Sequence, residues 1–321
     1  MPGGDPGLAC RVVVQETPDL PYLPELPNRG AGADMLGRGL ALMSRVSQDF
    51  GADTSPGGWR LAPAGQAMRR AESYLGNDMD ALAEEFASYE GPLTVTLVGP
   101  WTLVAGVEDR RGQRLLGDPG LVREVAAALA VTAADLVALL ARAVPRARPR
   151  LQIDEPALDA VLRGRVPTPS GYRRYDAVSA APAAALLTEV AESARSAGAD
   201  VWLHSCAPLD FDVLAAVALD GLSFDAARHR PVNDEGLGSW LESGRGITFG
   251  VWPTDRAEQA GDRTRAEALV VEPLQRLGLQ AHGLPGPAQL SPRCGLAAAP
   301  PESVPATFRV LRALARHLGQ E

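Results

Sequence analysis

The stretch VWLHSCAP, residues 201–208, is a short apolar run that ends in His204 and Cys206. The chain has only four histidines and three cysteines, and one of each lies here two positions apart. Such a pair either fills the core or binds a metal ion, because cysteine is among the most buried residue types and also a preferred zinc ligand. The same arrangement, polar residues directly after an apolar run, recurs along the chain and decides the fold.

Five further runs are apolar on both faces, as buried parallel strands are. They are LTVTLVGP (93–100), LQIDEP (151–156), GLSFDA (221–226), ITFGVWP (247–253) and AQLSPRCG (288–295). Between the runs lie segments with helical periodicity, at 121–143, 178–197, 209–219, 263–278 and 303–318. Strands that alternate with helices in this way predict an α/β fold with a parallel sheet.

Polar or functional side chains follow nearly every predicted strand. They are Asp154 and Glu155, His204 and Cys206, Asp225, Trp252, and Cys294. In an open doubly wound sheet the site gathers at one switch point and draws on fewer strands. In a (β/α)8 barrel every strand end points at one shared mouth. We therefore predict a TIM (β/α)8 barrel that spans residues 1–321 as one catalytic domain.

The strand count leaves the start of the barrel open. The segment LPYLPELP (20–27) can form an irregular strand, which gives seven. The segment RVVVQ (11–15) has strand propensity, but it follows DPGLAC, which resembles a helix start, and it could equally be helical. No clear first strand is found, so we expect the first strand of the barrel to be truncated at the N-terminus.

Composition excludes several classes of protein. A hydrophobic content of 46% and a charged content of 22% are typical of a soluble globular protein, and the net charge of −8 argues against nucleic-acid binding. No apolar run approaches the roughly 20 residues that cross a bilayer, so no membrane association is expected. Three widely spaced cysteines predict a reducing cytoplasm. All 31 basic residues are arginine, which excludes Schiff-base chemistry and a P-loop.

Two cysteines, one histidine and one carboxylate could form a zinc site. His204 and Cys206 share one strand end, Cys294 follows another apolar run, and Asp225 ends a third. Taken singly, each cysteine is more often a core residue and Asp225 could be a helix N-cap. Cys10, within LACRVVV, has no polar neighbours and is read as core. The joint placement at three strand ends favours zinc, which prefers thiolate and imidazole ligands.

Three of these motifs together resemble a known family. LQIDEPAL, then LHSC, then PRCGL resemble the catalytic barrel of the cobalamin-independent methionine synthases in order and approximate spacing, across about residues 90 to 300. The segment LPELPNRGAGADMLGR (23–38) resembles the short, single-barrel branch of that family. Each motif alone is weak evidence, but the combination is specific.

The resemblance implies a zinc-dependent methyltransferase of methionine biosynthesis that methylates the thiol of homocysteine. Zinc held by His204, Cys206, Cys294 and a carboxylate would lower the pKa of that thiol. Asp154 matches the family aspartate that holds the ammonium group of the amino acid, and Glu155 is expected beside it on the substrate-binding side.

The departures from the family lie mainly on the methyl-donor side. The fourth zinc ligand of the family is glutamate, where this chain offers Asp225; His229, expected in an exposed loop, is a competitor. The tryptophan and glutamate that serve folate in the family fall on Gly106 and Ala160, and Asp255 falls near its catalytic histidine. The donor therefore stays open between methyl-folate and a methyl-corrinoid, free or carried on a protein.

The resemblance also bears on the missing strand. The first strand of the family ends in a Gly-Ser-x-Pro loop, and MPGGDPG (1–7) resembles the end of that loop. This alignment puts CRVVVQ (10–15) into the first helix and the native start upstream. Two other functions remain open, which are alkyl transfer to another thiol such as coenzyme M and a non-catalytic paralogue with structural zinc.

Overall fold

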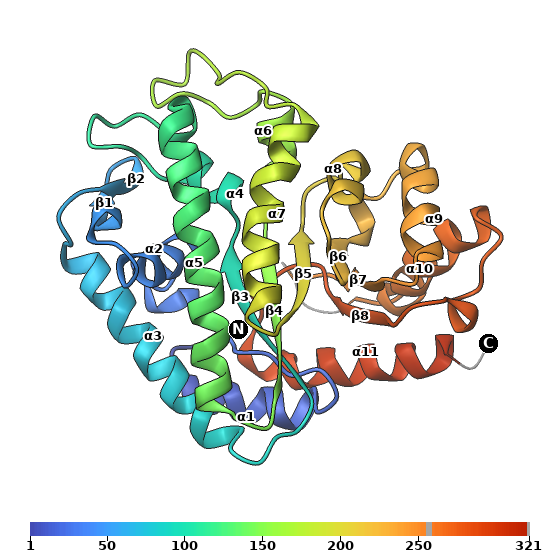
Figure 1. Cartoon of the computed structure of the whole chain (residues 1–321). Coiled ribbons are helices and arrows are strands. Elements are labelled where there is room, and N and C mark those ends of the chain that lie inside the picture. Colours follow the sequence, from blue (N-terminus) through green and yellow to red (C-terminus); the bar gives the residue numbers. More distant parts are fainter. Residues whose placement is uncertain (255–258, 320–321) are drawn as a thin grey trace.

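A curled parallel sheet forms the centre of the molecule (Figure 1). The computed structural model describes residues 1–254 and 259–319. The sheet runs in chain order through β3 (Pro92–Val98), β4 (Arg148–Asp154), β5 (Asp200–Ser205), β6 (Gly221–Asp225), β7 (Gly246–Trp252) and β8 (Ala288–Pro292). Each of the six predicted apolar runs forms one of these strands. The sheet curls as part of a barrel, so the predicted TIM-barrel type of fold is confirmed.

Helices connect the successive strands and cover the outside of the sheet (Figure 1). The predicted helical segments correspond to α5 (Pro119–Ala143), α7 (Ala180–Ser196), α8 (Phe211–Ala216), α10 (Asp262–Arg276) and α11 (Val304–Leu318). Local sequence explains where α5 begins, because Asp118 accepts hydrogen bonds from Gly120 N and Leu121 N and a proline follows it. Sequence reasoning missed the shorter α4 (Pro100–Gly106), α6 (Leu158–Leu162) and α9 (Asp234–Glu242).

The N-terminal region is helical where strand propensity suggested otherwise. RVVVQ lies inside α1 (Pro6–Glu16), whose first turn is capped by Asp5 accepting from Leu8 N. The cap and the proline at the first turn outweigh the β-branched residues. The placement of CRVVVQ in a helix is therefore confirmed. Between α1 and β3 the chain adds α2 (Met35–Ser44), the hairpin of β1 (Ala52–Ser55) and β2 (Gly58–Leu61), and α3 (Gln66–Glu85), none of which was predicted.

The segment 20–27 extends the sheet at the free edge of β3. Leu23 N donates to Thr94 O at 2.8 Å, and Thr94 N donates to Pro21 O at 3.0 Å. A regular ladder cannot form, because Pro21 and Pro24 have no amide hydrogen to donate. The segment is therefore the irregular strand that its sequence predicted.

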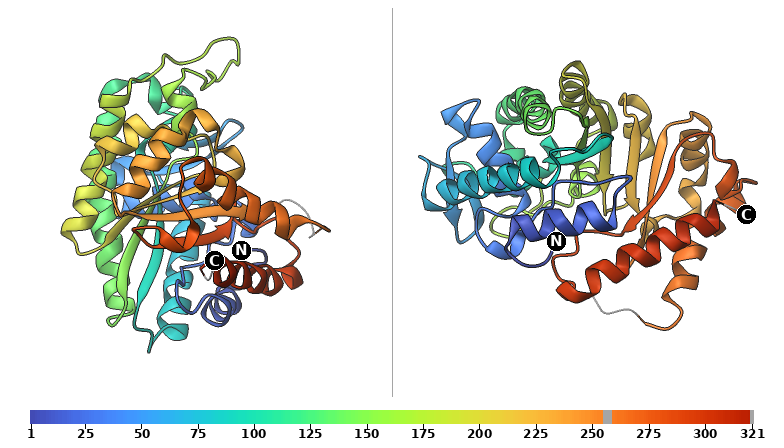
Figure 2. Two further views of the ribbon diagram at one scale, coloured as in Figure 1. Left: turned by 90° about the vertical axis from the view of Figure 1, so that its right-hand side faces the viewer. Right: turned by 90° about the horizontal axis from the view of Figure 1, so that it is seen from below.

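The two edges of the curled sheet are joined by side chains and by packed helices. In the described part of the chain no strand pairs with the outer edge of β8. Asn28 Nδ2 donates to Ala297 O at 2.8 Å, which connects segment 20–29 to the loop after β8. α1 and α11 lie side by side (Figure 2), and Arg312 forms an ion pair with Glu16 at 3.0 Å. These contacts hold the N-terminal and C-terminal parts against each other.

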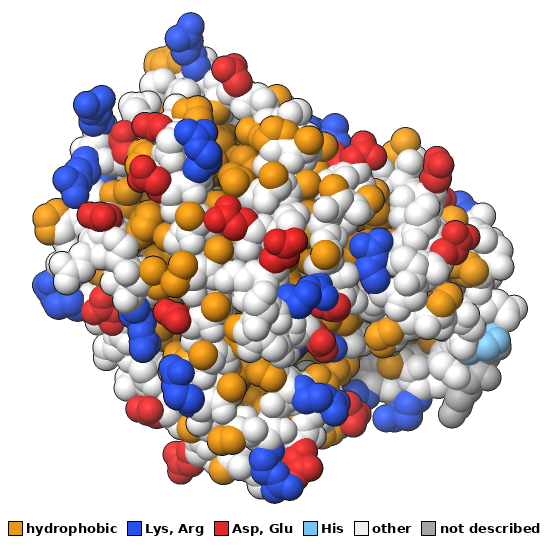
Figure 3. Space-filling model, in the orientation of Figure 1, with side chains coloured by type: hydrophobic (Ala, Val, Ile, Leu, Met, Phe, Trp, Pro, Cys, Tyr) orange, Lys and Arg blue, Asp and Glu red, His pale blue; other side chains and the backbone are white. Residues whose placement is uncertain are grey.

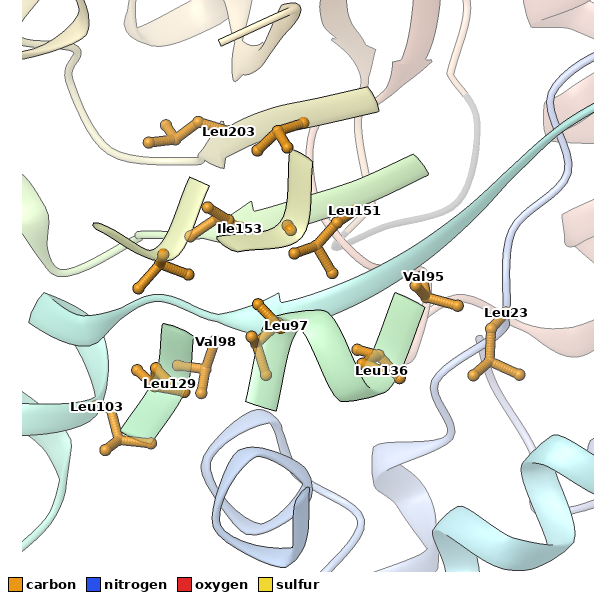
Figure 4. Close-up of a cluster of buried hydrophobic side chains, with 14 of the residues drawn as sticks. Leu23, Val95, Leu97, Val98, Leu103, Leu129, Leu136, Leu151, Ile153 and Leu203 are labelled. Atoms are coloured by element: carbon orange, nitrogen blue, oxygen red, sulfur yellow. The ribbon is translucent and has the colours of Figure 1, made fainter. Parts of the chain in front are cut away.

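The strands separate an apolar outer face from a polar inner face. Leu97 of β3 and Ile153 of β4 are buried, and Leu129 and Leu136 of α5 pack beside them (Figure 4). Successive side chains of a strand point to opposite faces, so the residues between these leucines and isoleucines face the inside of the curl. The inner face thereby receives the polar residues from which a site can be built.

Helix α5 corrects one expectation drawn from composition. It has 25 residues and is long and apolar enough to cross a membrane by length and composition, so the statement that no apolar run approaches this length is wrong. Half of its apolar window is buried inside the structure, and α5 packs against α7 and β4. One such helix is weak evidence for a membrane span, because the core helices of globular proteins pass the same test.

The charged surface is mixed in sign. On the face seen in Figure 3, arginines and acidic residues are interspersed rather than gathered by sign.

Candidate active site

The carboxyl ends of the strands bring the predicted polar residues to one mouth. Val98, Asp154, His204 and Ser223 are successive register partners across β3, β4, β5 and β6. Asp225 ends β6, and Cys206 and Cys294 follow β5 and β8. Four of the strands, β4, β5, β6 and β8, thus place polar or thiol side chains at the same end of the curled sheet.

Cys206 and Cys294 meet at this mouth. The two thiols interact, and each affects the pKa of the other. The neighbouring Cys206 lowers the pKa of Cys294 to about 6, although partial burial opposes this, and the Gly295 N–H also stabilises the Cys294 thiolate. Cys294 and partial burial raise the pKa of Cys206. Cys294 is therefore the thiol of the pair that ionises more readily.

His204 lies inside the barrel as a neutral imidazole. Its Nδ1 is 3.0 Å from the hydroxyl oxygen of Ser223 on the neighbouring strand. Burial lowers the pKa of His204 to about 4. A neutral ring whose orientation is set by a second residue is the form in which histidine binds metals.

Asp225 is an N-cap residue, which the sequence analysis gave as the alternative to a zinc ligand. Its Oδ1 accepts from Ala227 N at 3.0 Å, which caps the 3-10 turn Ala226–Arg228. The guanidinium groups of Arg228 and Arg293 lie 3.7 and 3.9 Å from its oxygens, and burial raises the pKa of Asp225. Among the described residues, no three His, Cys, Asp or Glu side chains are grouped so that they could hold a metal ion. Zinc binding by Asp225, His204 and the two cysteines therefore stays a prediction.

His229 is not in an exposed loop, so that expectation is wrong. Its side chain is 4% exposed, and its Nε2 lies 2.6 Å from an oxygen of Asp234. The ring also packs edge-on against Phe224. Asp234 is further held by Arg276, so the histidine belongs to a structural ion-pair cluster at the start of α9.

A second carboxylate, Glu25, accompanies Asp154. Asp154 is 5% exposed and accepts from Gln152 Nε2 at 2.7 Å. Burial and the negative charge of Glu25 raise the pKa of Asp154 well above its usual value. Oε1 of Glu25 accepts from Thr96 Oγ1 at 2.7 Å and from Arg38 Nε at 3.0 Å. Sequence reasoning missed Glu25, although it is the polar residue near the end of the predicted strand 20–27.

Both carboxylate oxygens of Glu155 accept hydrogen bonds from backbone amides of α4. It is fully buried, and its oxygens accept from Trp101 N at 2.9 Å, Thr102 N at 2.8 Å and Thr102 Oγ1 at 2.6 Å. Burial raises its pKa to about 7, although these hydrogen bonds favour the carboxylate. Glu155 thus caps the N-terminus of α4 and fixes that helix to the end of β4. A contact between Glu155 and substrate stays a prediction.

The positions that serve folate in the family present no free aromatic or acidic side chain here. A Cβ at Gly106 would lie 2.6 Å from Leu36 Cδ1, so this position is closely packed. Trp101 is 3% exposed, and its Nε1 donates to Ala183 O at 3.0 Å. Ala160 is half-buried. Asp255, the residue predicted near the catalytic histidine of the family, lies outside the described residues.

Comparison with known proteins identifies the family. The fold and site define a TIM-barrel-type protein with two thiols, an imidazole and carboxylates at its mouth. The chain belongs to the cobalamin-independent methionine synthases, because the family model described as "Cobalamin-independent synthase, Catalytic domain" matches residues 110–317. A search of curated protein sequences finds no match.

A solved structure supports the fold. The chain is similar to a B12-independent methionine synthase from Shewanella sp. W3-18-1, solved in complex with selenomethionine, with a TM-score of 0.50 and 16% sequence identity. The similarity covers 76% of this chain and 66% of that one, so this chain spans just under two thirds of its relative. At this level of identity the likeness concerns the fold.

Proposed function

We propose that this protein transfers a methyl group to the thiol of homocysteine and so forms methionine, with zinc as its metal. The observation that carries the proposal is the interaction of two thiols, Cys206 and Cys294, at the mouth of a member of the cobalamin-independent synthase family. The Shewanella relative was solved with selenomethionine, an analogue of the proposed product.

Zinc would be held by Cys206, Cys294, His204 and the carboxylate of Asp225. When bound there, zinc supplies Lewis-acid chemistry that lowers the pKa of a thiol ligand. The protonation states of the chain suit such a metal, since Cys294 has a lowered pKa and His204 stays neutral.

The ammonium group of the amino acid would lie between Asp154 and Glu25. Burial and the negative charge of Glu25 disfavour the ionised form of Asp154. A cation between the two would relieve this repulsion and form charge-assisted hydrogen bonds. The chain thus offers a receptor for the thiol end and another for the amino end of one small molecule.

The donor side favours a methyl-corrinoid over methyl-folate. Gly106 is packed against Leu36 and Ala160 has no polar side chain, so neither position supplies the stacking or acidic group expected for folate. The discriminating assay measures methionine formation from homocysteine with methylcobalamin and with methyl-folate as separate donors. Turnover with methylcobalamin alone is the expected result.

The metal and the reaction are tested together. We expect the purified protein to contain zinc, and zinc X-ray absorption to gain a sulfur ligand when homocysteine is added. Cys294→Ser should lose both zinc and turnover, whereas Cys10→Ala, a change at a buried position of α1 away from the two thiols of the mouth, should keep both. Full zinc content in Cys294→Ser would contradict the ligand assignment, and absence of methionine with either donor would contradict the function.

A further inference from the structure

Glu25 is held by a buried ion-pair network that reaches back from the mouth. Arg38 of α2 donates from Nε to Glu25 Oε1 at 3.0 Å and from Nη1 to Asp78 Oδ2 at 2.8 Å. The side chains of Arg38 and Asp78 are 4% and 0% exposed. Arg29 completes the network with two hydrogen bonds to Asp78, at 2.7 and 2.8 Å.

The network is balanced in charge but differs in exposure along its length. Two guanidinium groups meet two carboxylates, which offsets the cost of removing each charge from water. Asp78 is fully buried, whereas the side chain of Glu25 is 26% exposed. Arg29 alone already gives Asp78 a bidentate partner, so Arg38 is not needed merely to neutralise Asp78. Of the two arginines, only Arg38 contacts Glu25.

Two donors from different elements fix the same oxygen of Glu25. Arg38 approaches Oε1 from α2, and Thr96 donates to Oε1 from β3. No described residue forms a hydrogen bond with the other oxygen, Oε2. A carboxylate fixed through one oxygen presents the second in a defined direction without paying for side-chain ordering when a ligand binds.

We propose that Arg38, anchored by Asp78, is a positioning residue that fixes Glu25 so that Oε2 is presented to the ammonium group of the amino-acid substrate. The inference rests on the proposed function, because it assumes that Asp154 and Glu25 receive that ammonium. Arginine is required here because its planar guanidinium donates to Glu25 and Asp78 at the same time. A lysine at position 38 carries the same charge but cannot reproduce this fork.

The test compares two ligands that differ only in the amino group. Homocysteine and 4-mercaptobutanoate share the thiol, the carboxylate and the chain length, and their affinities are measured by calorimetry on the zinc-loaded protein. We expect Arg38→Lys to weaken homocysteine about tenfold, the effect of losing one charge-assisted hydrogen bond, and to leave 4-mercaptobutanoate unchanged. Arg29→Lys is the matched control, because Arg29 contacts Asp78 but not Glu25.

A double-mutant cycle decides whether Arg38 acts through Glu25. In a Glu25→Gln background, Arg38→Lys should cause little further loss of homocysteine affinity. In turnover, Arg38→Lys should raise KM for homocysteine and leave kcat nearly unchanged. Equal weakening of both ligands, or an additive loss in the double variant, would mean that Arg38 only supports the fold and would overturn the inference.

A second variant covers the case in which Arg38→Lys does not fold. Thr96→Val keeps the size of the side chain and removes the other hydrogen bond to Oε1, so it should produce the same loss for homocysteine alone. Retained homocysteine affinity in Thr96→Val would then overturn the inference. If the wild-type protein binds homocysteine, a negative result in the variants contradicts only the positioning role of Arg38. If it binds no homocysteine, the proposed function itself fails.

Discussion

The thiols of Cys206 and Cys294 interact at the mouth of the barrel, although one residue follows β5 and the other follows β8. Two strands, β6 and β7, lie between them in the sheet. The contact exists only because the sheet curls enough to bring these strand ends to one mouth. The consequence is chemical, since the neighbouring Cys206 lowers the pKa of Cys294.

Cys294 should be the most reactive cysteine of the metal-free protein. Its pKa of about 6 makes it largely thiolate at pH 7, and it is exposed, whereas burial raises the pKa of Cys10 to about 12. Iodoacetamide at pH 7 should therefore modify Cys294 first, as read by mass spectrometry of peptides. Cys206→Ala removes the neighbouring thiol that lowers the pKa of Cys294 and should shift the pH midpoint of the reaction upward. A midpoint unchanged by Cys206→Ala would contradict the assigned cause.

His204 should make the metal-free protein less stable in mild acid. Its pKa falls from 6.5 in the unfolded chain to about 4 in the folded one, so below pH 6.5 the unfolded state binds a proton that the folded state does not. The free energy of unfolding should therefore fall by about 3 kcal/mol between pH 6.5 and pH 4 on account of this group. Urea unfolding of wild type and His204→Asn at both pH values isolates this contribution.

The exposed His282 provides the control for that experiment. His282→Asn should keep the pH dependence of the wild type, whereas His204→Asn should flatten it. Equal slopes in wild type and His204→Asn would show that burial of the neutral imidazole does not contribute.

Local sequence was sufficient for much of this architecture. LQIDEP and VWLHSC begin as continuous apolar runs, and such runs are typical of parallel strands that are buried on both faces. The shared mouth followed from the barrel, because all strand ends of that fold meet. The meeting of Cys206 with Cys294 could thus be anticipated without any knowledge of distances.

Other features depend on partners that no local pattern records. RVVVQ is helical because Asp5 caps its first turn, and His229 is buried because Asp234 and Phe224 surround it. The position of the Glu25 carboxylate depends on Arg38 and Thr96, which come from different elements. Such long-range polar contacts must be seen in the folded chain.

Glu155 should contribute mainly to stability. Glu155→Ala would leave the amides of Trp101 and Thr102 without their acceptor in a buried place, at a cost of about 1–3 kcal/mol for each donor. Glu155→Gln keeps an oxygen acceptor and should cost less. Urea unfolding is the measurement, and Glu124→Ala, at an exposed position of α5, is the control. An unfolding free energy of Glu155→Ala equal to that of Glu124→Ala would contradict the capping role.

The floor of the barrel, which is the end of its interior where the strands begin, should tolerate no added methyl group at Gly221 or Gly246. Trp202, on the inner face of β5, is 3% exposed, and the guanidinium of Arg150 stacks on its ring at 4.2 Å. Its indole lies over the first residues of the next two strands, where a Cβ at Gly221 or Gly246 would come within 2.2 or 2.5 Å of the ring. Neither glycine has a positive φ, so the space taken by the indole, and not backbone conformation, excludes alanine there.

Gly221→Ala should therefore destabilise the protein by about 1–3 kcal/mol, because the buried indole must move within a close-packed core. Gly76→Ala is the opposite case, since Gly76 is exposed within α3 and has no atom within 4 Å of an added Cβ. There alanine should stabilise by about 0.5–1 kcal/mol through its higher helix propensity. Thermal and urea unfolding of both variants measure the difference in sign, and stabilisation by both substitutions would mean that Trp202 does not fill the floor as described.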